Sequence, residues 1–219
     1  MTQMEALDSL QEAVLDGEEE LAAELAEQVL DMDVSPQRVL DVLSAAADDL
    51  GRRYESGEYF LPELFAGAEA MSAAVAKVLP VLEQSGGEHK GTVVIGTVEG
   101  DVHDIGKRIV VAMLSGAGFR VHDLETDVRA SLFVDKVREL QPDIVAASAY
   151  LTTTSQRLPE ISQALTEAGI RSEVMYLIGG AAVSREMIKS TGADGYGENA
   201  AEAVSVARKL VEQIRSKRS

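Results

Sequence analysis

The hydrophobic pattern changes near residue 90, and this change limits the fold more than any other feature of the 219-residue sequence. Before that point, apolar residues recur every three or four positions, as in amphipathic helices. After it, short runs rich in Val and Ile alternate with helical stretches. The polar, Gly-containing segment between the two patterns suits an exposed linker. We therefore predict a domain over residues 1–84, a linker over 85–90 and a second domain over 91–219.

The first domain is predicted to be a bundle of four helices. Two apolar stripes flank a break at Asp16-Gly17, and their members are Leu7, Leu10 and Val14, then Leu21, Leu25 and Val29. A third helix is predicted to begin at Ser35-Pro36, because Ser is a favoured N-cap and Pro suits the first helical position. The segment Tyr54–Pro62 interrupts the pattern, and Pro62 is predicted to start a long fourth helix.

The second domain is predicted to be an α/β domain with a flavodoxin-like (Rossmann-like) five-stranded parallel sheet. Candidate strands cover 92–98, 119–124, 143–148, 174–178 and 194–196. Candidate helices cover 105–116, 131–140, 154–169, 185–190 and 200–214. Right-handed crossovers place such helices on both faces of the sheet. A ligand is expected beyond the carboxyl ends of the strands, near the switch between the first and the third.

Composition and charge exclude several classes of function. The formal charge is −17, and residues 1–90 hold 20 acids and 5 bases, so a nucleic-acid backbone is repelled rather than bound. The sequence has no Cys, which excludes disulfides and thiolate metal sites. No apolar run reaches the ~18 residues that a membrane span needs, and the N-terminus does not resemble a signal peptide. We therefore expect a cytoplasmic protein without nucleic-acid or membrane partners.

The loop after the first strand carries the residues most suited to chemistry, Asp101 and His103. Imidazole is a common metal ligand, and a ligating His often donates its other N–H to a carboxylate, for which Asp101 is well placed. A closed zinc site needs about four ligands, so a single His would serve if a macrocycle supplied the others. Other interpretations remain open: His103 is solvated, Asp101 or Asp104 caps the next helix, and Gly106 only allows close packing.

Other ligand motifs of this fold are missing from the sequence. The first strand is followed neither by a G-x-G-x-x-G pattern nor by a Walker A pattern, and no Ser/Thr-rich loop suits FMN. A response regulator would have a lysine at the end of the fifth strand, and none is present.

Three strand ends together resemble the cobalamin-binding domain of corrinoid proteins, whose signature is D-x-H-x-x-G, S-x-L and G-G. Segment 101–106 matches the first part, and a 41-residue gap (107–147) leads to Ser148. A 28-residue gap (151–178) then leads to Gly179-Gly180. One residue departs from the pattern, since Tyr150 stands where the family has Leu.

The segment 54–64 resembles the part of the helical cap domain that covers the upper face of the corrin. The whole chain is thus similar to the cap plus cobalamin-binding module of cobalamin-dependent methionine synthase.

The resemblance implies a role for each matching residue. His103 would be the lower axial ligand of cobalt, with Asp101 and Thr154 completing a hydrogen-bonded relay. Tyr54 and Leu61 would guard the upper face of the corrin. Cofactor-binding residues would be Tyr54, Leu61, Gly100, Asp101, Val102, His103, Asp104, Ile105, Gly106, Ser148, Tyr150, Thr152, Gly179 and Gly180.

The resemblance implies a corrinoid methyl carrier rather than a complete enzyme. Its partners would be a substrate-specific methyltransferase, a second methyltransferase and a corrinoid reductive activator. Two alternatives stay open: a free-standing cobalamin- or light-sensing module, and a flavodoxin-like domain that has lost its cofactor. The absence of Trp disfavours the light sensor. The methyl donor, which the partner enzyme sets, cannot be read from this chain.

Overall fold

The computed structural model describes residues 2–84 and 89–218. Contacts between Cα atoms divide the chain into two compact units. One holds residues up to His89 together with Ala112–Phe119, and the other holds Lys90–Val111 and residues from Arg120 onward. Residues 85–88 of the predicted linker lie outside the described residues.

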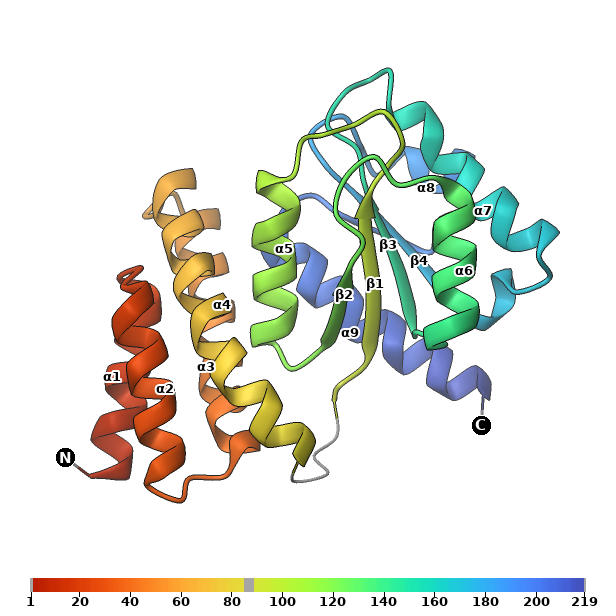
Figure 1. Ribbon diagram of the computed structural model, residues 1–219. Coiled ribbons are helices and arrows are strands. Elements are labelled where there is room, and N and C mark those ends of the chain that lie inside the picture. The colour runs from red at the N-terminus through yellow and green to blue at the C-terminus, as the bar shows by residue number, and fades with distance from the viewer. Residues whose placement is uncertain (1, 85–88, 219) are drawn as a thin grey trace. The chain divides into compact units, whose positions relative to one another are not determined.

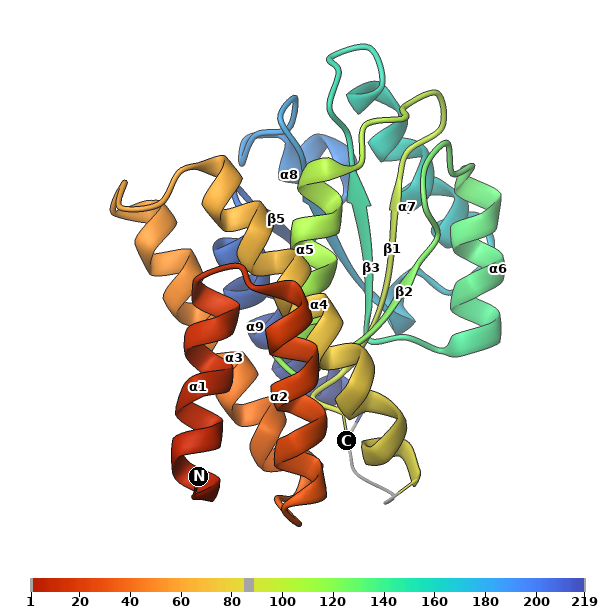
Figure 2. The ribbon, with the colours of Figure 1, turned by 60° about the vertical axis from the view of Figure 1, so that its left-hand side comes forward.

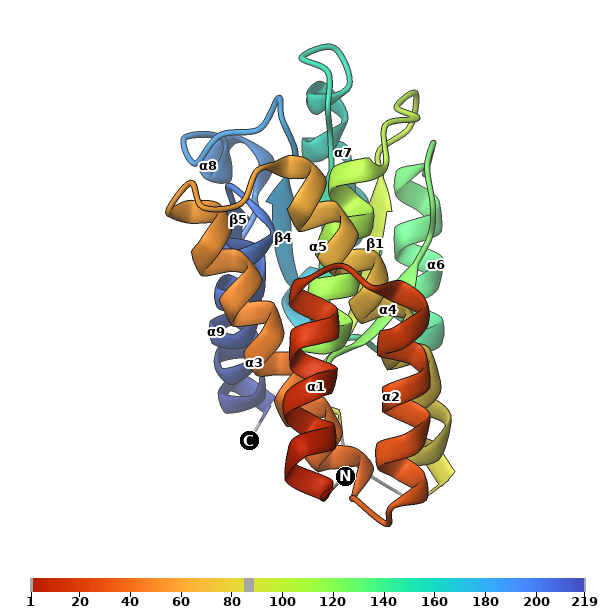
Figure 3. The same ribbon diagram turned by 90° about the vertical axis from the view of Figure 1, so that its left-hand side faces the viewer.

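The first unit contains four long helices, as the sequence predicts (Figure 3). They are α1 (Gln3–Leu15), α2 (Glu19–Asp31), α3 (Pro36–Glu55) and α4 (Leu61–Gln84). α4 packs against α2 and α3, and α1 packs against α2 and α3. The predicted cap of the third helix is present, because Ser35 Oγ accepts a hydrogen bond from the Arg38 N–H and Pro36 occupies the first turn.

Two predictions for these helices are wrong in detail. Leu21, assigned to the buried stripe of the second helix, is 41% exposed. The stripe is instead made by two alanines, Ala22 and Ala26, with Leu25 and Val29, so α2 lies close to its neighbours through small side chains. α3 continues to Glu55, which places Tyr54 inside the helix and limits the predicted interruption to residues 56–60.

One helix differs from the prediction that the chain has no membrane-length apolar segment. By length and composition alone, residues Leu61–Leu82 of α4 are sufficient to cross a membrane. This helix packs within the bundle, where Leu64, Met71 and Val78 are buried. Lys77 on its outer side forms an ion pair with Glu27 of α2, with 2.6 Å between Nζ and Oε1. α4 is therefore a core helix of the first unit.

The second unit is a five-stranded parallel sheet in the order β2-β1-β3-β4-β5, which confirms the flavodoxin-like prediction. The strands are β1 (Thr92–Thr97), β2 (Arg120–Asp123), β3 (Ile144–Ser148), β4 (Met175–Gly179) and β5 (Gly195–Gly197). The helices are α5 (Ile105–Gly116), α6 (Ala130–Leu140), α7 (Leu158–Glu167), α8 (Met187–Thr191) and α9 (Ala200–Arg218). α6 and α7 cover one face of the sheet, and α5 and α9 cover the other (Figures 1 and 2).

Two helices of this unit depart from their predicted bounds. The predicted helix over 154–169 begins as a single 3-10 turn, Ser155–Arg157, and becomes an α-helix only at Leu158. Pro159 explains the later start, because its missing N–H is tolerated only in the first turn of a helix. α9 runs past the predicted end at residue 214, and Arg218 donates from Nη1 to Asp143 Oδ1 at 2.8 Å.

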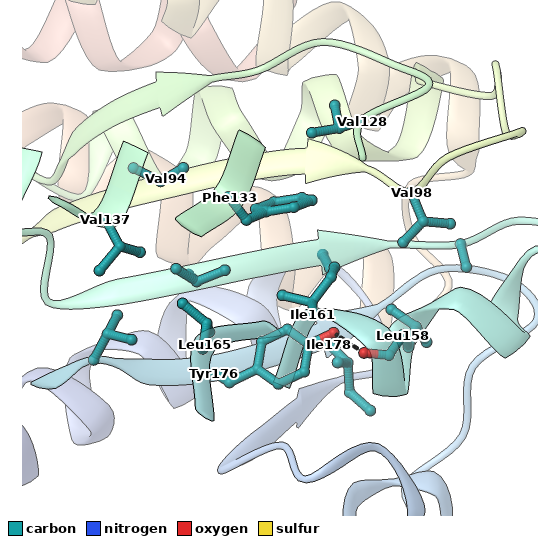
Figure 4. Packing of buried hydrophobic residues seen from close by; sticks show 14 of the residues in the cluster. Val94, Val98, Val128, Phe133, Val137, Leu158, Ile161, Leu165, Tyr176 and Ile178 are labelled. Carbon is teal, nitrogen blue, oxygen red and sulfur yellow. Dashed lines mark hydrogen bonds between the residues drawn. The ribbon is translucent and has the colours of Figure 1, made fainter. Parts of the chain in front are cut away.

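Tyr176 of β4 shows how polar atoms are accommodated in the core of this unit. It is fully buried in a cluster that contains Phe133, Leu165 and Ile178, and its hydroxyl donates to the Leu158 carbonyl at 2.9 Å (Figure 4). This bond joins the sheet to the first residue of α7.

A Tyr176→Phe variant tests the contribution of this bond. We expect the free energy of unfolding to fall by about 1 kcal/mol, because a buried carbonyl loses its hydroxyl donor while packing is kept. Urea unfolding followed by circular dichroism measures the change. A variant as stable as the parent protein would show that the bond contributes nothing net.

Candidate functional site

The loop after β1 holds Asp101 and His103 in fixed positions. Asp101 is fully buried, and its Oδ1 accepts hydrogen bonds from the backbone N–H of His103 at 3.1 Å and from the ring Nδ1 at 2.8 Å. The Thr97 hydroxyl donates to the His103 carbonyl at 3.3 Å. Both the backbone and the ring of His103 are therefore tied to the end of β1.

The loop after β3 reaches the same carboxylate from the other side. The Thr154 hydroxyl donates to Asp101 Oδ2 at 2.6 Å, and the Tyr150 N–H donates to the same oxygen at 2.8 Å. Thr154 is itself buried. Because β1 and β3 are neighbours at the switch in strand order, their following loops emerge from one edge of the sheet (Figure 1). The structure thus brings the three predicted relay residues together.

These contacts decide the charge on Asp101. Burial by itself raises the pKa of a carboxyl group, but hydrogen bonds from Thr154, Tyr150 and His103 oppose it and hold the pKa of Asp101 well below its usual range. An ionised carboxylate can only accept hydrogen bonds, so Nδ1 of His103 carries the proton. In the neutral ring this leaves a lone pair on Nε2, and the side chain is 45% exposed.

The donor chemistry fits a metal held by one protein ligand. A histidine with one ring nitrogen on a carboxylate and the other free is the usual arrangement of a metal-ligating imidazole. Within residues 2–84 and 89–218, no three His, Asp or Glu side chains gather as a metal cluster. A metal on His103 would therefore need its other ligands from a bound group.

Exposed apolar side chains flank His103 along the chain and also occur in the loop after β3. Val102 and Ile105 follow β1, Tyr150 and Leu151 follow β3, and they are between 40% and 72% exposed. We call these four residues the apolar rim. Large apolar side chains that gather in water commonly mark a binding surface.

The glycines predicted to form a slot for the nucleotide tail divide into two kinds. A Cβ on Gly106 would meet nothing within 4 Å, so open space lies beside α5. A Cβ on Gly179 would lie 3.1 Å from the Gly197 carbonyl oxygen, and one on Gly180 would lie 2.3 Å from the Ala149 carbonyl oxygen. The chain's own backbone therefore requires glycine at Gly180 and leaves little room for a side chain at Gly179.

The remaining predicted residues of this unit lie on the same edge of the sheet. Ser148 ends β3 and is half-buried, and its register partners are Thr97 on β1 and Gly179 on β4. Thr152 is exposed on the loop after β3. Gly100 adopts φ +80° and donates its N–H to Asp127 Oδ1 at 2.7 Å.

In the first unit, Tyr54 and Leu61 lie on either side of the turn between α3 and α4. Tyr54 is half-buried and Leu61 is exposed, as is the adjacent Phe60. The turn is fixed by Tyr59, whose hydroxyl donates to the Leu15 carbonyl at 3.2 Å and accepts from Arg53 Nη1 at 2.8 Å. The unit therefore presents apolar side chains at a well-anchored turn.

Two features of the site were not predicted from the sequence. Lys107, in the first turn of α5, is buried and forms an ion pair with Asp123 at the end of β2. The burial of Lys107 could have been predicted from its spacing of seven residues from the buried Leu114, because residues at this spacing share a helix face. The second feature is the bond from Gly100 to Asp127, for which the sequence carries no signal.

Comparison with known proteins agrees with this site. Models described as a B12 binding domain match residues 6–79 and 91–205. Trimethylamine corrinoid protein 1 of Methanosarcina acetivorans is 42% identical over 210 residues, which cover 94% of this chain and 97% of that protein.

Two solved structures are similar over nearly the whole chain. A cobalamin-binding protein from Desulfitobacterium hafniense has a TM-score of 0.75 and 33% identity, covering 93% of this chain and 98% of that one. A chain of the methanol:cobalamin methyltransferase complex from Methanosarcina barkeri has a TM-score of 0.78 and 32% identity, covering 95% of this chain and 80% of that one. With both B12-binding models and these relatives matching almost its full length, the chain belongs to the cobalamin-binding corrinoid proteins.

Proposed function

We propose that this corrinoid protein is a methyl carrier that binds cobalamin with the cofactor's own base displaced and His103 in its place. The observation that carries the proposal is the His103–Asp101–Thr154 chain of hydrogen bonds, which leaves Nε2 of His103 free. The corrinoid would supply cobalt chemistry that accepts and releases a methyl group. The protein chain itself would bind and orient the corrinoid and shield its methyl group.

His103 would hold the cobalt through Nε2, and Asp101 would keep the proton on Nδ1. Because the carboxylate stays ionised, it accepts from Nδ1 and leaves Nε2 as the ring nitrogen that can bind a metal. Thr154 would fix the carboxylate by donating to Oδ2. Together, Asp101 and Thr154 would therefore set the orientation of the His103 ligand.

The apolar rim and Gly106 would receive the rest of the cofactor. Val102, Ile105 and Leu151 of the rim would lie against the corrin. The open space beside Gly106 would admit the nucleotide tail, with Ser148 at the end of β3 and Thr152 on the loop that follows it. Gly179 and Gly180 would shape that region through the backbone. Tyr54 and Leu61 would cover the upper face of the corrin.

The partners would be two methyltransferases and a corrinoid reductive activator. Similarity to a trimethylamine corrinoid protein and to a chain of a methanol:cobalamin methyltransferase complex supports a small methylated compound as the donor. Trimethylamine is the first donor to test, because that relative is the more similar in sequence.

The first experiment is an absorbance spectrum of the protein after incubation with hydroxocobalamin and removal of the excess, repeated with His103→Ala. We expect near-stoichiometric corrinoid on the parent protein and a changed cobalt spectrum in the variant. Absence of retained corrinoid would reject both the carrier and the sensor functions. Equal retention with identical spectra would reject ligation by His103 alone.

A second experiment tests the methyl-carrier function. The loaded and reduced protein is mixed with a trimethylamine-specific methyltransferase and trimethylamine, and then with a methanol-specific enzyme and methanol. Methyl uptake from either donor supports the carrier. Stable loading without uptake from either donor would reject trimethylamine and methanol as the methyl donors.

A further inference from the structure

The Tyr150 side chain lies flat against the imidazole of His103. The two ring centroids are 4.3 Å apart and the ring planes differ by 19°, which is a stacked arrangement. Tyr150 is also the one position at which this sequence departs from the S-x-L pattern of its family. The stack therefore involves the residue that departs from that pattern.

The stack restrains a motion that the hydrogen bond to Asp101 leaves free. The bond between Nδ1 and Oδ1 fixes the direction of one ring nitrogen, but the ring can still tilt about that bond. A second ring against its face opposes the tilt, because leaving the offset contact costs stacking energy. Two restraints of different kinds therefore define the direction of Nε2.

We infer that Tyr150 is a positioning residue, whose ring holds the His103 imidazole in the orientation that binds cobalt before the cofactor arrives. The inference rests on the proposed ligation by His103. A ligand oriented in advance loses less conformational freedom on binding, so the ring increases corrinoid affinity through His103 rather than through its own contact with the cofactor.

Backbone geometry makes the side chain of Tyr150 separable from the rest of the site. Its N–H donates to Asp101 Oδ2 at 2.8 Å, a bond that any residue except proline can make at this position. Tyr150→Leu therefore removes the ring and keeps that bond. Tyr150→Phe keeps the ring and removes only the hydroxyl, which makes it the matched control.

The first test uses the protein without cofactor. The carbon-bound ring protons of His103 are measured by NMR in the parent protein and in both variants, and His103→Ala provides the assignment. We expect upfield ring-current shifts in the parent and in Tyr150→Phe, and their loss in Tyr150→Leu. Equal shifts in all three proteins would show that the rings are not stacked and would overturn the inference.

The second test is a double-mutant cycle on hydroxocobalamin affinity. We expect Tyr150→Leu to weaken binding roughly three- to tenfold when His103 is present, Tyr150→Phe to restore it, and Tyr150→Leu to have no effect in the His103→Ala background. An equal loss in both backgrounds would show direct contact with the cofactor and would overturn the positioning role. Thermal unfolding of each variant checks that the fold is kept.

The cycle also distinguishes failure of this inference from failure of the proposed function. If His103→Ala weakens binding and Tyr150→Leu does not, the ligand assignment stands and the positioning role falls. If His103→Ala leaves both affinity and spectrum unchanged, the proposed ligation falls and the positioning role falls with it.

Discussion

Replacing Asp101 by alanine is expected to lower the free energy of unfolding by about 3 kcal/mol at neutral pH. The buried carboxylate accepts hydrogen bonds from the Thr154 hydroxyl, from the Tyr150 N–H and from both N–H groups of His103. Alanine removes the shared acceptor and leaves several donors without one. Urea unfolding at pH 7 measures the difference between parent and variant.

The same pair of proteins gives a test with a defined sign in pH. The pKa of Asp101 is lower in the folded chain than the value of about 3.9 expected for an unfolded one. A carboxyl of this kind contributes stability that is fully present above the unfolded pKa and is lost as the pH falls toward the folded one. The stability difference between parent and Asp101→Ala is therefore expected to narrow below about pH 4.

A carboxylate outside the site serves as the control. Asp135 is exposed on α6, and its replacement by alanine is expected to change stability by no more than about 0.5 kcal/mol. The difference in the free energy of unfolding between the parent and Asp101→Ala could instead stay constant from neutral pH to pH 3, roughly one unit below the unfolded pKa. That result would contradict an ionised Asp101 at the centre of these hydrogen bonds.

Gly180→Ala is expected to lower the free energy of unfolding by about 3 kcal/mol and to reduce corrinoid retention with it. Gly180 has φ +113°, a conformation that side chains rarely adopt. The new Cβ would lie 2.3 Å from the carbonyl oxygen and 2.8 Å from the nitrogen of Ala149. Both are backbone atoms beside β3, so relief requires the strand end itself to move.

Gly169→Ala is a control that has the backbone strain of a positive φ without the steric clash expected for Gly180→Ala. Gly169 has φ +75°, and a Cβ there would meet nothing within 4 Å. Its replacement is expected to cost about 1 to 2 kcal/mol, from the left-handed conformation alone. Chemical denaturation of both variants measures the comparison, and equal losses would mean that the approach to Ala149 contributes nothing.

The order of the sheet was predictable because it depends on repeated, local signals. Alternating apolar runs and helical stretches define βα units, and right-handed crossovers leave few topologies for five of them. α5 begins and ends where the sequence predicts. Leu21 was wrongly predicted to be buried. Hydrophobic periodicity identifies the apolar face of a helix, but it does not show which edge of that face a neighbouring helix covers.

The site was predictable only as far as each loop carries its own pattern. Asp101 and His103 belong to a spaced motif, Thr154 was expected from the family resemblance, and the structure brings the three together. The bond from Gly100 to Asp127 joins loops 27 residues apart, and such pairing depends on backbone paths that no local pattern records. The stacking of Tyr150 on His103 likewise depends on the direction of two side chains from different loops.

The apolar rim also has a consequence for how copies of the ligand-free chain behave in solution. Large apolar side chains open to water favour association between molecules. The formal charge of −17 opposes this, because like-charged molecules repel once they approach within about one Debye length, roughly 8 Å at physiological ionic strength. The net negative charge thus opposes association of ligand-free chains through electrostatic repulsion. Added salt screens this repulsion and weakens its effect.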